Sequence, residues 1–257
     1  WVGARGKVHC FKIGYNENGI PKLHPIKIEN QIIKSAALSI KEVDDGSIWI
    51  GTAGEGLLKF DRTHNTLKKF EVRDNNSALK SMAILAIEED QTGDLWIGGN
   101  PFENNFISRA GAPAGLLKLN IQSREIQEFF ADPKDLISLS SNRIRSLLVD
   151  KTGVLWVGAG ISGLNVYDKS VTKFSLVTTG PEEKNKIRGP IRGFYLDDNK
   201  ILWVASQGGG LIAYDRENEK YEIFNCKEND PSSISTDFVQ CIYDDGNYLW
   251  IGTQQGL

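Results

Sequence analysis

The stretch Gly93-Asp94-Leu95-Trp96-Ile97-Gly98-Gly99 recurs with small changes along the 257-residue chain. All six tryptophans stand in this phrase, each followed by Val or Ile and then Gly or Ala: Trp1, Trp49, Trp96, Trp156, Trp203 and Trp250. The steps between them are 48, 47, 60, 47 and 47 residues. Periods of this size are typical of repeat architectures. The repeat therefore decides the fold.

The pattern within one unit is clearest between residues 144 and 177. Four short apolar runs, at 144–150, 154–158, 164–168 and 173–177, are separated by turn residues such as Gly, Asp and Ser. Such runs are typical of strands joined by hairpin turns, whereas helical periodicity does not persist in any unit. Four strands per 47 residues make one propeller blade. We predict an all-β protein, a β-propeller of four-stranded antiparallel blades with about five repeats.

The repeats predict one propeller segment over residues 1–257, centred on the six tryptophans. Because the sequence begins and ends within a repeat, we expect it to be part of a larger array of seven or more blades. Five periods closing into a ring of their own also fit the pattern.

The repeated phrase reads as scaffold. An Asp ends the first strand of each unit and a turn Gly often follows: Asp44, Asp90, Asp150, Asp197 and Asp244, with Gly46, Gly93 and Gly153. Asp bonds its own backbone in turns, and Gly supplies positive φ. Each Trp, placed mid-strand among aliphatic residues, is expected to fill the wedge between blades, and the Gly after it to allow close approach of a neighbour. A stacking platform for sugars or bases is the alternative for the Trp series.

Bulk properties narrow the function classes. The formal net charge is −3 with acidic and basic residues interspersed, which speaks against nucleic-acid binding. There is neither a run of 18 apolar residues nor a signal-peptide pattern. The cysteines, Cys10, Cys226 and Cys241, have no metal-binding spacing. A Cys226–Cys241 disulfide is one reading, and a buried free thiol at Cys241 is the favoured one.

The pattern Asp-x-x-Gly-x-Leu-Trp-Ile-Gly-Thr, followed by Gly-Gly-Leu and an aromatic-Asp end, resembles the two-component regulator propeller repeat. The resemblance covers the whole chain, with departures at Lys200, Ala205 and Gly99. It implies the extracytoplasmic, periplasmic sensor region of a membrane-bound bacterial receptor, such as a hybrid histidine kinase or a diguanylate cyclase. The residues of the family motif are structural, so the resemblance identifies no binding or catalytic residue in this chain.

Variation between units is greatest in the loop after the second strand. In the second unit this loop runs from Gly99 to Gly115 and accounts for the step of 60 residues. We predict ligand-binding residues here, because loops on a rigid scaffold commonly carry function: Asn100, Phe102, Asn105, Phe106 and Arg109. The alternatives are a decorative loop and a contact with the parent protein.

A second group of candidates lies at the predicted channel mouth. Arg145 and Arg192 each stand eleven residues before a Trp, and Asn142 and Asp237 lie nearby by the same alignment. Two arginines facing a channel can bind a carboxylate or sulfate. A salt bridge to an acidic residue of a neighbouring blade is the competing interpretation.

No hydrolase, metalloprotease, phosphate-loop or EF-hand motif occurs, so we predict a non-catalytic segment with no cofactor and no metal site. The predicted function is ligand sensing, with a small molecule or oligosaccharide as ligand and homodimerisation through the parent receptor. The competing hypotheses are a stand-alone propeller enzyme of lyase or quinoprotein type and a lectin-like or protein-docking ring.

Overall fold

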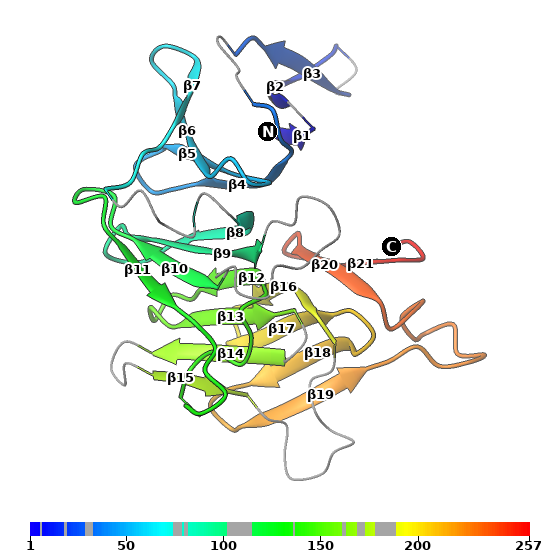
Figure 1. Cartoon of the computed structure of the whole chain (residues 1–257). Coiled ribbons are helices and arrows are strands. Elements are labelled where there is room, and N and C mark those ends of the chain that lie inside the picture. Colours follow the sequence, from blue (N-terminus) through cyan, green and yellow to red (C-terminus); the bar gives the residue numbers. More distant parts are fainter. Residues whose placement is uncertain are drawn as a thin grey trace. The chain divides into compact units, whose positions relative to one another are not determined.

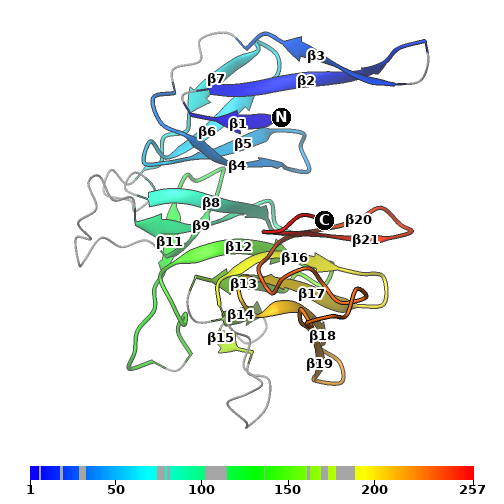
Figure 2. The ribbon, with the colours of Figure 1, turned by 90° about the vertical axis from the view of Figure 1, so that its right-hand side faces the viewer.

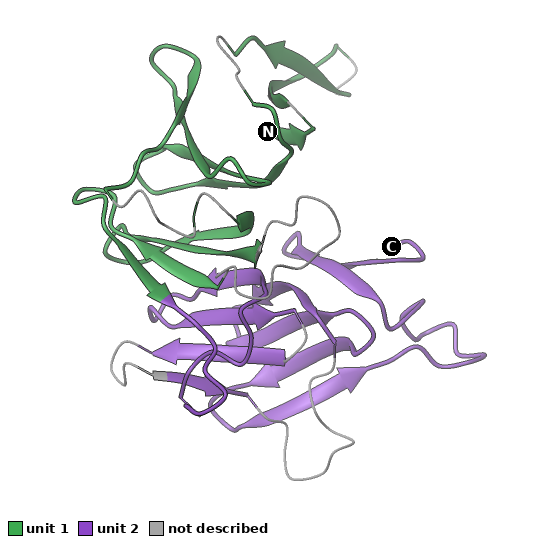
Figure 3. Cartoon of the chain, in the orientation of Figure 1, with its two compact units in different colours: residues 1–128 green, residues 129–257 purple. Residues whose placement is uncertain are grey.

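Every regular element that the computed structural model describes is a β-strand (Figure 1). The described residues are 1–5, 7–17, 20–28, 33–73, 79, 82–101, 115–135, 137–160, 163–168, 173–177 and 189–257. The chain divides into two compact units, unit 1 over Trp1–Glu128 and unit 2 over Phe129–Leu257 (Figure 3).

Unit 1 holds one three-stranded and two four-stranded antiparallel sheets. The three-stranded sheet comprises β1 (Val2–Ala4), β2 (Lys7–Tyr15) and β3 (Pro21–Ile26). The first complete blade comprises β4 (Ala37–Glu42), β5 (Ile48–Thr52), β6 (Leu57–Asp61) and β7 (Thr66–Lys69). The second comprises β8 (Met82–Glu89), β9 (Leu95–Pro101), β10 (Leu116–Leu119) and β11 (Ile126–Phe129).

Unit 2 holds two four-stranded sheets and one two-stranded sheet, again antiparallel. One blade comprises β12 (Ile144–Val149), β13 (Leu155–Ala159), β14 (Gly163–Asp168) and β15 (Lys173–Leu176). The next comprises β16 (Ile191–Leu196), β17 (Ile201–Ser206), β18 (Gly210–Asp215) and β19 (Lys220–Phe224). The last sheet pairs β20 (Val239–Asp244) with β21 (Leu249–Thr253). The predicted four-stranded units, including the four runs between 144 and 177, are confirmed.

The first strands of successive sheets lie side by side within each unit. In unit 1, β4 lies beside β8; in unit 2, β12 lies beside β16, and β16 beside β20 (Figure 2). The hydroxyl of Ser39 on β4 donates a hydrogen bond to the Ile84 carbonyl on β8, at 3.0 Å. Ser146 on β12 makes the equivalent bond to Ile191 on β16, at 3.2 Å. The first strands are thus fastened to each other as well as to their own sheets.

Two interior tryptophans, Trp49 and Trp156, pack toward the following sheet of their own unit. Trp49 is buried in a cluster with β8 and β9 residues, and Trp156 is buried with Ile191, Val204 and Ile212 of the next blade. The wedge prediction is thereby confirmed for these two. It is wrong for Trp250, which is 45% exposed, whereas Trp1, 36% exposed, packs edge-on against Phe60 of the following sheet with ring centroids 4.7 Å apart. No other sheet in the described residues of unit 2 covers the Trp250 face.

The Gly that follows the Trp phrase faces a small residue on the first strand. The cross-strand pairs are Ser39–Gly51, Ala86–Gly98, Ser146–Gly158, Gly193–Ala205 and Cys241–Gly252. A Cβ at Gly158 would lie 2.2 Å from Ser146 Oγ and 2.8 Å from Ile191 Cβ of the next blade. The prediction of close approach is confirmed. In the blade that has Ala205 in place of this Gly, the cross-strand partner is Gly193. The larger residue of the pair is therefore on the second strand here and on the first strand in the other blades.

The turn chemistry is also as predicted in most blades. Gly46, Gly93 and Gly153 have φ of 78°, 78° and 85°, and Lys200, which replaces the turn Gly, is itself left-handed with φ of 66°. Gly99 replaces Thr because a Cβ there would lie 2.1 Å from the Ala83 carbonyl oxygen.

Cysteine predictions are partly corrected. Cys10, Cys226 and Cys241 are all free, so the structure contains no Cys226–Cys241 disulfide. The burial expected for Cys241 is wrong, because Cys241 lies on the last sheet, on the strand pair whose Trp250 is also uncovered.

Candidate functional site

Each first strand carries a β-bulge at the same position. The cross-strand register shifts between Ala37 and Ser39, and equivalent shifts occur on the other four first strands. The residue left without a cross-strand partner is Leu38, Leu85, Arg145, Arg192 or Gln240, in chain order. A bulge frees one side chain from the ladder and redirects it, and bulges are common near functional sites. In each of these sheets, the bulge side chain and the end of the second strand form an edge that we call the bulge edge of that sheet.

Arg145 on β12 has no hydrogen-bond partner for its Nε. That atom is buried, while the residue as a whole is half-buried. A buried guanidinium N–H without an acceptor is costly, because it loses water and gains nothing in return. Among the described residues, no acidic group compensates it, so the predicted salt bridge to a neighbouring blade is not present there.

Arg192 on β16 holds the equivalent position and does have a partner. Its Nε donates to Gln207 Oε1 at 2.9 Å, and its Nη2 donates to the same oxygen. Gln207 stands four residues after Trp203, and the residue four after Trp156 is Gly160. The two arginines therefore differ because only one blade supplies an acceptor at this place.

Arginines surround Arg145. Burial lowers the pKa of Arg145, and the positive charges of Arg192 and Arg143 lower it further. An arginine nevertheless stays charged at any physiological pH. The bulge edges of the two complete blades of unit 2 thus gather three cations in a protein whose net charge is −3. An anion placed among these cations would offset their mutual repulsion.

The sequence-predicted residues of the long loop are placed only in part. Asn100 lies on β9, which runs through Pro101, so the strand continues two residues beyond the expected start of the loop. Its side-chain Oδ1 is buried without a hydrogen-bond partner. Asn100 is four residues after Trp96 and so corresponds to Gly160 and Gln207. Phe102, Asn105, Phe106 and Arg109 lie outside the described residues.

Asn142 and Asp237 are brought to equivalent places, where each closes the loop ahead of a first strand. Asn142 Oδ1 accepts the Ala131 N–H at 2.6 Å, and Asp237 Oδ1 accepts the Cys226 N–H at 2.7 Å. In both cases the acceptor lies eleven residues after the donor. These side chains hold backbone in the structure, which gives them a scaffold role beside the binding role expected from sequence.

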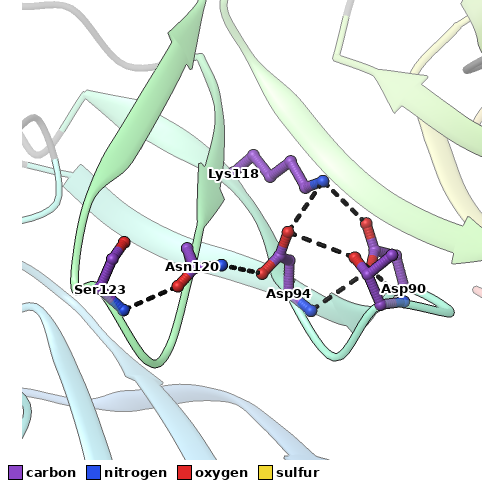
Figure 4. A network of polar contacts seen from close by, with 6 residues as sticks. Asp90, Asp94, Lys118, Asn120 and Ser123 are labelled. Atoms are coloured by element: carbon purple, nitrogen blue, oxygen red, sulfur yellow. Dashed lines mark hydrogen bonds and ion pairs between the residues drawn. The ribbon is translucent and has the colours of Figure 1, made fainter.

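A polar network in the second blade of unit 1 is another cluster of charged groups (Figure 4). Lys118 Nζ lies 3.1 Å from Asp90 Oδ2 and 3.0 Å from Asp94 Oδ2, and Asn120 Nδ2 donates to Asp94 Oδ1 at 2.8 Å. Burial lowers the pKa of Lys118, but the hydrogen bonds and charges of the two aspartates outweigh it and raise that pKa. With its groups paired to one another, this network locks two hairpins and offers no open binding position.

The aspartate at this turn has a different partner in unit 2. Asp150 Oδ2 accepts the Trp156 indole N–H, and Asp197 Oδ2 accepts that of Trp203, both at 3.0 Å. The spacing is six residues in each case. In the first blade of unit 1 the corresponding residue is Val43, and Trp49 Nε1 is buried without a partner. Asp44, one residue later, is therefore not equivalent to Asp150 and Asp197, which corrects the sequence alignment. On the last sheet the indole N–H of Trp250 donates to Asp245, five residues before it, and not to Asp244.

Sequence reasoning missed Arg143, Gly160 and Gln207 as parts of the edge. The signal was present in the repeat itself, because Asn100, Gly160 and Gln207 all stand four residues after a Trp. If the repeats are aligned on their tryptophans, the residue four places after the Trp can be compared with the arginine eleven places before it. This comparison shows that Arg192 is matched with Gln207, whereas Arg145 is matched with Gly160, which has no side-chain acceptor.

Comparison with known proteins places the fold. A family model described as two component regulator propeller matches residues 78–100 and 138–160. The chain is similar to the extracellular domain of a hybrid two-component system of B. thetaiotaomicron, with a TM-score of 0.68 and 20% identity over 94% of this chain and 29% of that one. It is also similar to PorZ, a surface component of the type-IX secretion system of Porphyromonas gingivalis, with a TM-score of 0.69 and 18% identity over 99% of this chain and 38% of that one.

A curated relative, Histidine kinase P4 of Formosa agariphila, is 27% identical over 130 residues, which are 50% of this chain and 8% of that protein. The chain thus spans well under half the length of each of these relatives. Strands of this pattern, register and repeat define a β-propeller repeat protein. The matched segments, residues 78–100 and 138–160, are similar to two component regulator propeller repeats. In the described ranges, no helix has the length and apolar character needed to cross a membrane.

Proposed function

We propose that this chain is a ligand-sensing, non-catalytic part of the extracytoplasmic propeller of a membrane-bound two-component receptor. The relatives support this reading, since one is the extracellular domain of a hybrid two-component system and another is a histidine kinase. The segment itself carries recognition, and signalling output belongs to other parts of such a receptor. An oligosaccharide is the proposed ligand, and a homodimer of the receptor is the proposed assembly.

One observation carries the proposal. The Trp positions and the small cross-strand pairs recur from blade to blade, while the bulge residue is leucine in the two complete blades of unit 1, arginine in the two of unit 2 and Gln240 on the last sheet. Several buried side-chain polar atoms of the described residues have no hydrogen-bond partner, and two of them, Asn100 Oδ1 and Arg145 Nε, lie at bulge edges. Unpaired buried polar atoms cost stability unless a ligand or water satisfies them. This supports the bulge edges as recognition surfaces, together with Asn105, Phe102, Phe106 and Arg109 of the long loop.

The proposal is tested with a glycan array probed with the 257-residue chain. We expect a defined set of glycans to bind, and Asn100→Ala or deletion of residues 101–112 to reduce that binding at least about tenfold, the cost of about one charge-assisted or well-formed hydrogen bond. Lys220→Gln, on the exposed outer strand β19, is the matched control and leaves binding unchanged.

Failure of every arrayed glycan to bind the folded chain would refute the oligosaccharide proposal. Binding that survives both Asn100→Ala and the deletion would remove the long loop and its edge from the recognition surface. The same changes made in a full receptor test whether binding controls signalling. The signalling response to the glycan should fall in parallel with the glycan affinity, because a ligand shifts a conformational equilibrium only through its different affinities for the two states.

A further inference from the structure

The bulge edges of the two complete blades of unit 2 are charged, and their charge is unpaired within the described residues. Arg145 and Arg192 occupy the bulge positions of the neighbouring first strands β12 and β16. Arg143 lies two residues before Arg145, and its carbonyl accepts the Gly160 N–H at 2.7 Å. The backbone of these two blades therefore brings three arginines to these neighbouring edges, two on first strands and Arg143 just before β12.

Gly160 stands where the neighbouring blade has Gln207, and this difference leaves the guanidinium of Arg145 without a side-chain acceptor. Gln207 occupies two N–H groups of Arg192. At Gly160, a Cβ would lie 3.6 Å from Arg145 Nε, so this position is close to the unpartnered atom but supplies no side-chain acceptor to it. A ligand oxygen bound to Arg145 would take the role that Gln207 Oε1 plays for Arg192.

The chemistry of that oxygen follows from the charges. A neutral hydroxyl would satisfy one N–H but would not offset three neighbouring positive charges. A carboxylate or sulfate does both, because a guanidinium presents a planar fork that matches two anionic oxygens. Such charge-assisted bonds are about twice as strong as neutral ones.

We propose that Arg143, Arg145 and Arg192 form a binding site for one carboxylate or sulfate group of the ligand. Arg145 is the central group, and Gln207 holds Arg192 in place beside it. This inference rests on the proposed function and narrows its ligand class to acidic saccharides, either uronates or sulfate esters. Arg192 remains partly available, because five donors are present on each guanidinium and Gln207 takes two.

The test is calorimetric titration of the 257-residue chain with four probes: sodium sulfate, a galacturonic acid trisaccharide, a 6-sulfated glucose disaccharide and neutral cellotriose. We expect at least one acidic saccharide to bind, cellotriose to bind at least about tenfold more weakly, and affinity to fall with added salt. The two acidic probes separate the carboxylate source from the sulfate source.

Variants locate the site. Arg145→Gln should weaken the acidic probe about 10- to 100-fold, as expected for a hydrogen bond to a charged group. Gly160→Gln should weaken binding of the acidic probe similarly, because the new amide oxygen can accept from Arg145 as Gln207 Oε1 accepts from Arg192. The backbone φ of Gly160 lies outside the left-handed region, so a side chain is compatible with the backbone. Its Cβ would lie 3.2 Å from Arg143 Cβ, which must shift slightly. Lys151→Gln, an exposed lysine 3.8 Å from Asp198, is the control for loss of one positive charge.

Equal affinity of wild type and both variants would overturn the inference, and so would equal weakening by Lys151→Gln. Thermal unfolding of each variant shows whether it is folded, and the acidic probe should raise the midpoint of the wild type but not of Arg145→Gln. Glycan binding that ignores Arg145 would refute this site and leave the proposed function standing. Acidic-saccharide binding at Arg145 without any receptor output would refute the sensor function and leave the site standing.

Discussion

The complete blades of unit 1 and unit 2 share one backbone plan and differ in what they present at the bulge. Unit 1 places Leu38 and Leu85 there, and unit 2 places Arg145 and Arg192. The bulge residue has no cross-strand partner, so its identity is not fixed by pairing. The comparison teaches that one scaffold carries an apolar edge in one unit and a cationic edge in the other.

The turn aspartates of the two units also make different contacts. In unit 2, Asp150 and Asp197 each accept a tryptophan N–H. In unit 1, Asp90 is paired with Lys118, whereas the first blade has Val43 at this place and leaves Trp49 Nε1 unpaired. The tryptophans are common to both units, but the polar contacts around them differ from blade to blade.

The shared part of the plan is tested most strongly at Trp156. Trp156→Ala should lower the free energy of unfolding by about 3–5 kcal/mol, because a buried indole is removed and a cavity is left. Trp250→Ala is the matched control, and since that ring is 45% exposed its cost should be about 1 kcal/mol or less. Urea unfolding measures both, and equal costs would mean that the tryptophans are not wedges between sheets.

The difference in polar support is tested at Lys118. Lys118→Met leaves Asp90, whose side chain is 2% exposed, without its cation, and should cost about 2–4 kcal/mol. Lys59 holds the same place in the first blade, where it lies over the Trp49 ring at 5.0 Å and no aspartate is present at the Val43 position. Lys59→Met should therefore cost about 1 kcal/mol or less, the scale of an exposed cation–π contact.

The raised pKa of Lys118 gives a second readout for the same pair of variants. A lysine whose folded pKa is raised contributes stability that is present at neutral pH and lost as the pH rises through that folded pKa. Alkaline titration should therefore destabilise the wild type and Lys59→Met more than Lys118→Met. Parallel loss in all three would show that the network of Figure 4 does not act through this ammonium group.

The smallest effect is expected at the irregular turn of unit 2. Lys200 is left-handed at φ 66°, while Gly46, Gly93 and Gly153 take the same conformation without a side chain. Lys200→Gly should raise the free energy of unfolding by about 0.5–1 kcal/mol, less the small contribution of the exposed Lys200–Glu217 ion pair. Lys200→Ala keeps the left-handed strain and serves as the control, so stabilisation by both changes would contradict the turn argument.

The fold was predictable because its signals are periodic. One Trp per unit, the turn residues and the runs between 144 and 177 identified four strands per blade, and the close approach at the Gly after each Trp followed from residue type alone. Asp44 was misaligned because an aspartate one residue away satisfies the same local turn pattern. The exposure of Trp1, Trp250 and Cys241 depends on which sheets cover a face, and a local pattern does not contain that information.

The candidate site was predictable only in part. The shared offset of Arg145 and Arg192 from their tryptophans placed both on first strands. That Arg145 lacks an acceptor depends on the absent side chain of Gly160, and that Asn142 and Asp237 hold loop backbone depends on tertiary geometry. Phe102, Asn105, Phe106 and Arg109 stay predictions from sequence.

The exchange of volume between Gly193 and Ala205 bears on how such arrays grow by duplication and recombination. In the other blades a small residue on the first strand faces Gly on the second, so a crossover between those two strands could place Ser146 opposite an alanine. A crossover between blades would carry each matched pair intact. We therefore expect folded chimaeras of these repeats to have their crossover points outside the hairpin formed by the first and second strands of a blade. Recombination would then exchange this hairpin only as a whole.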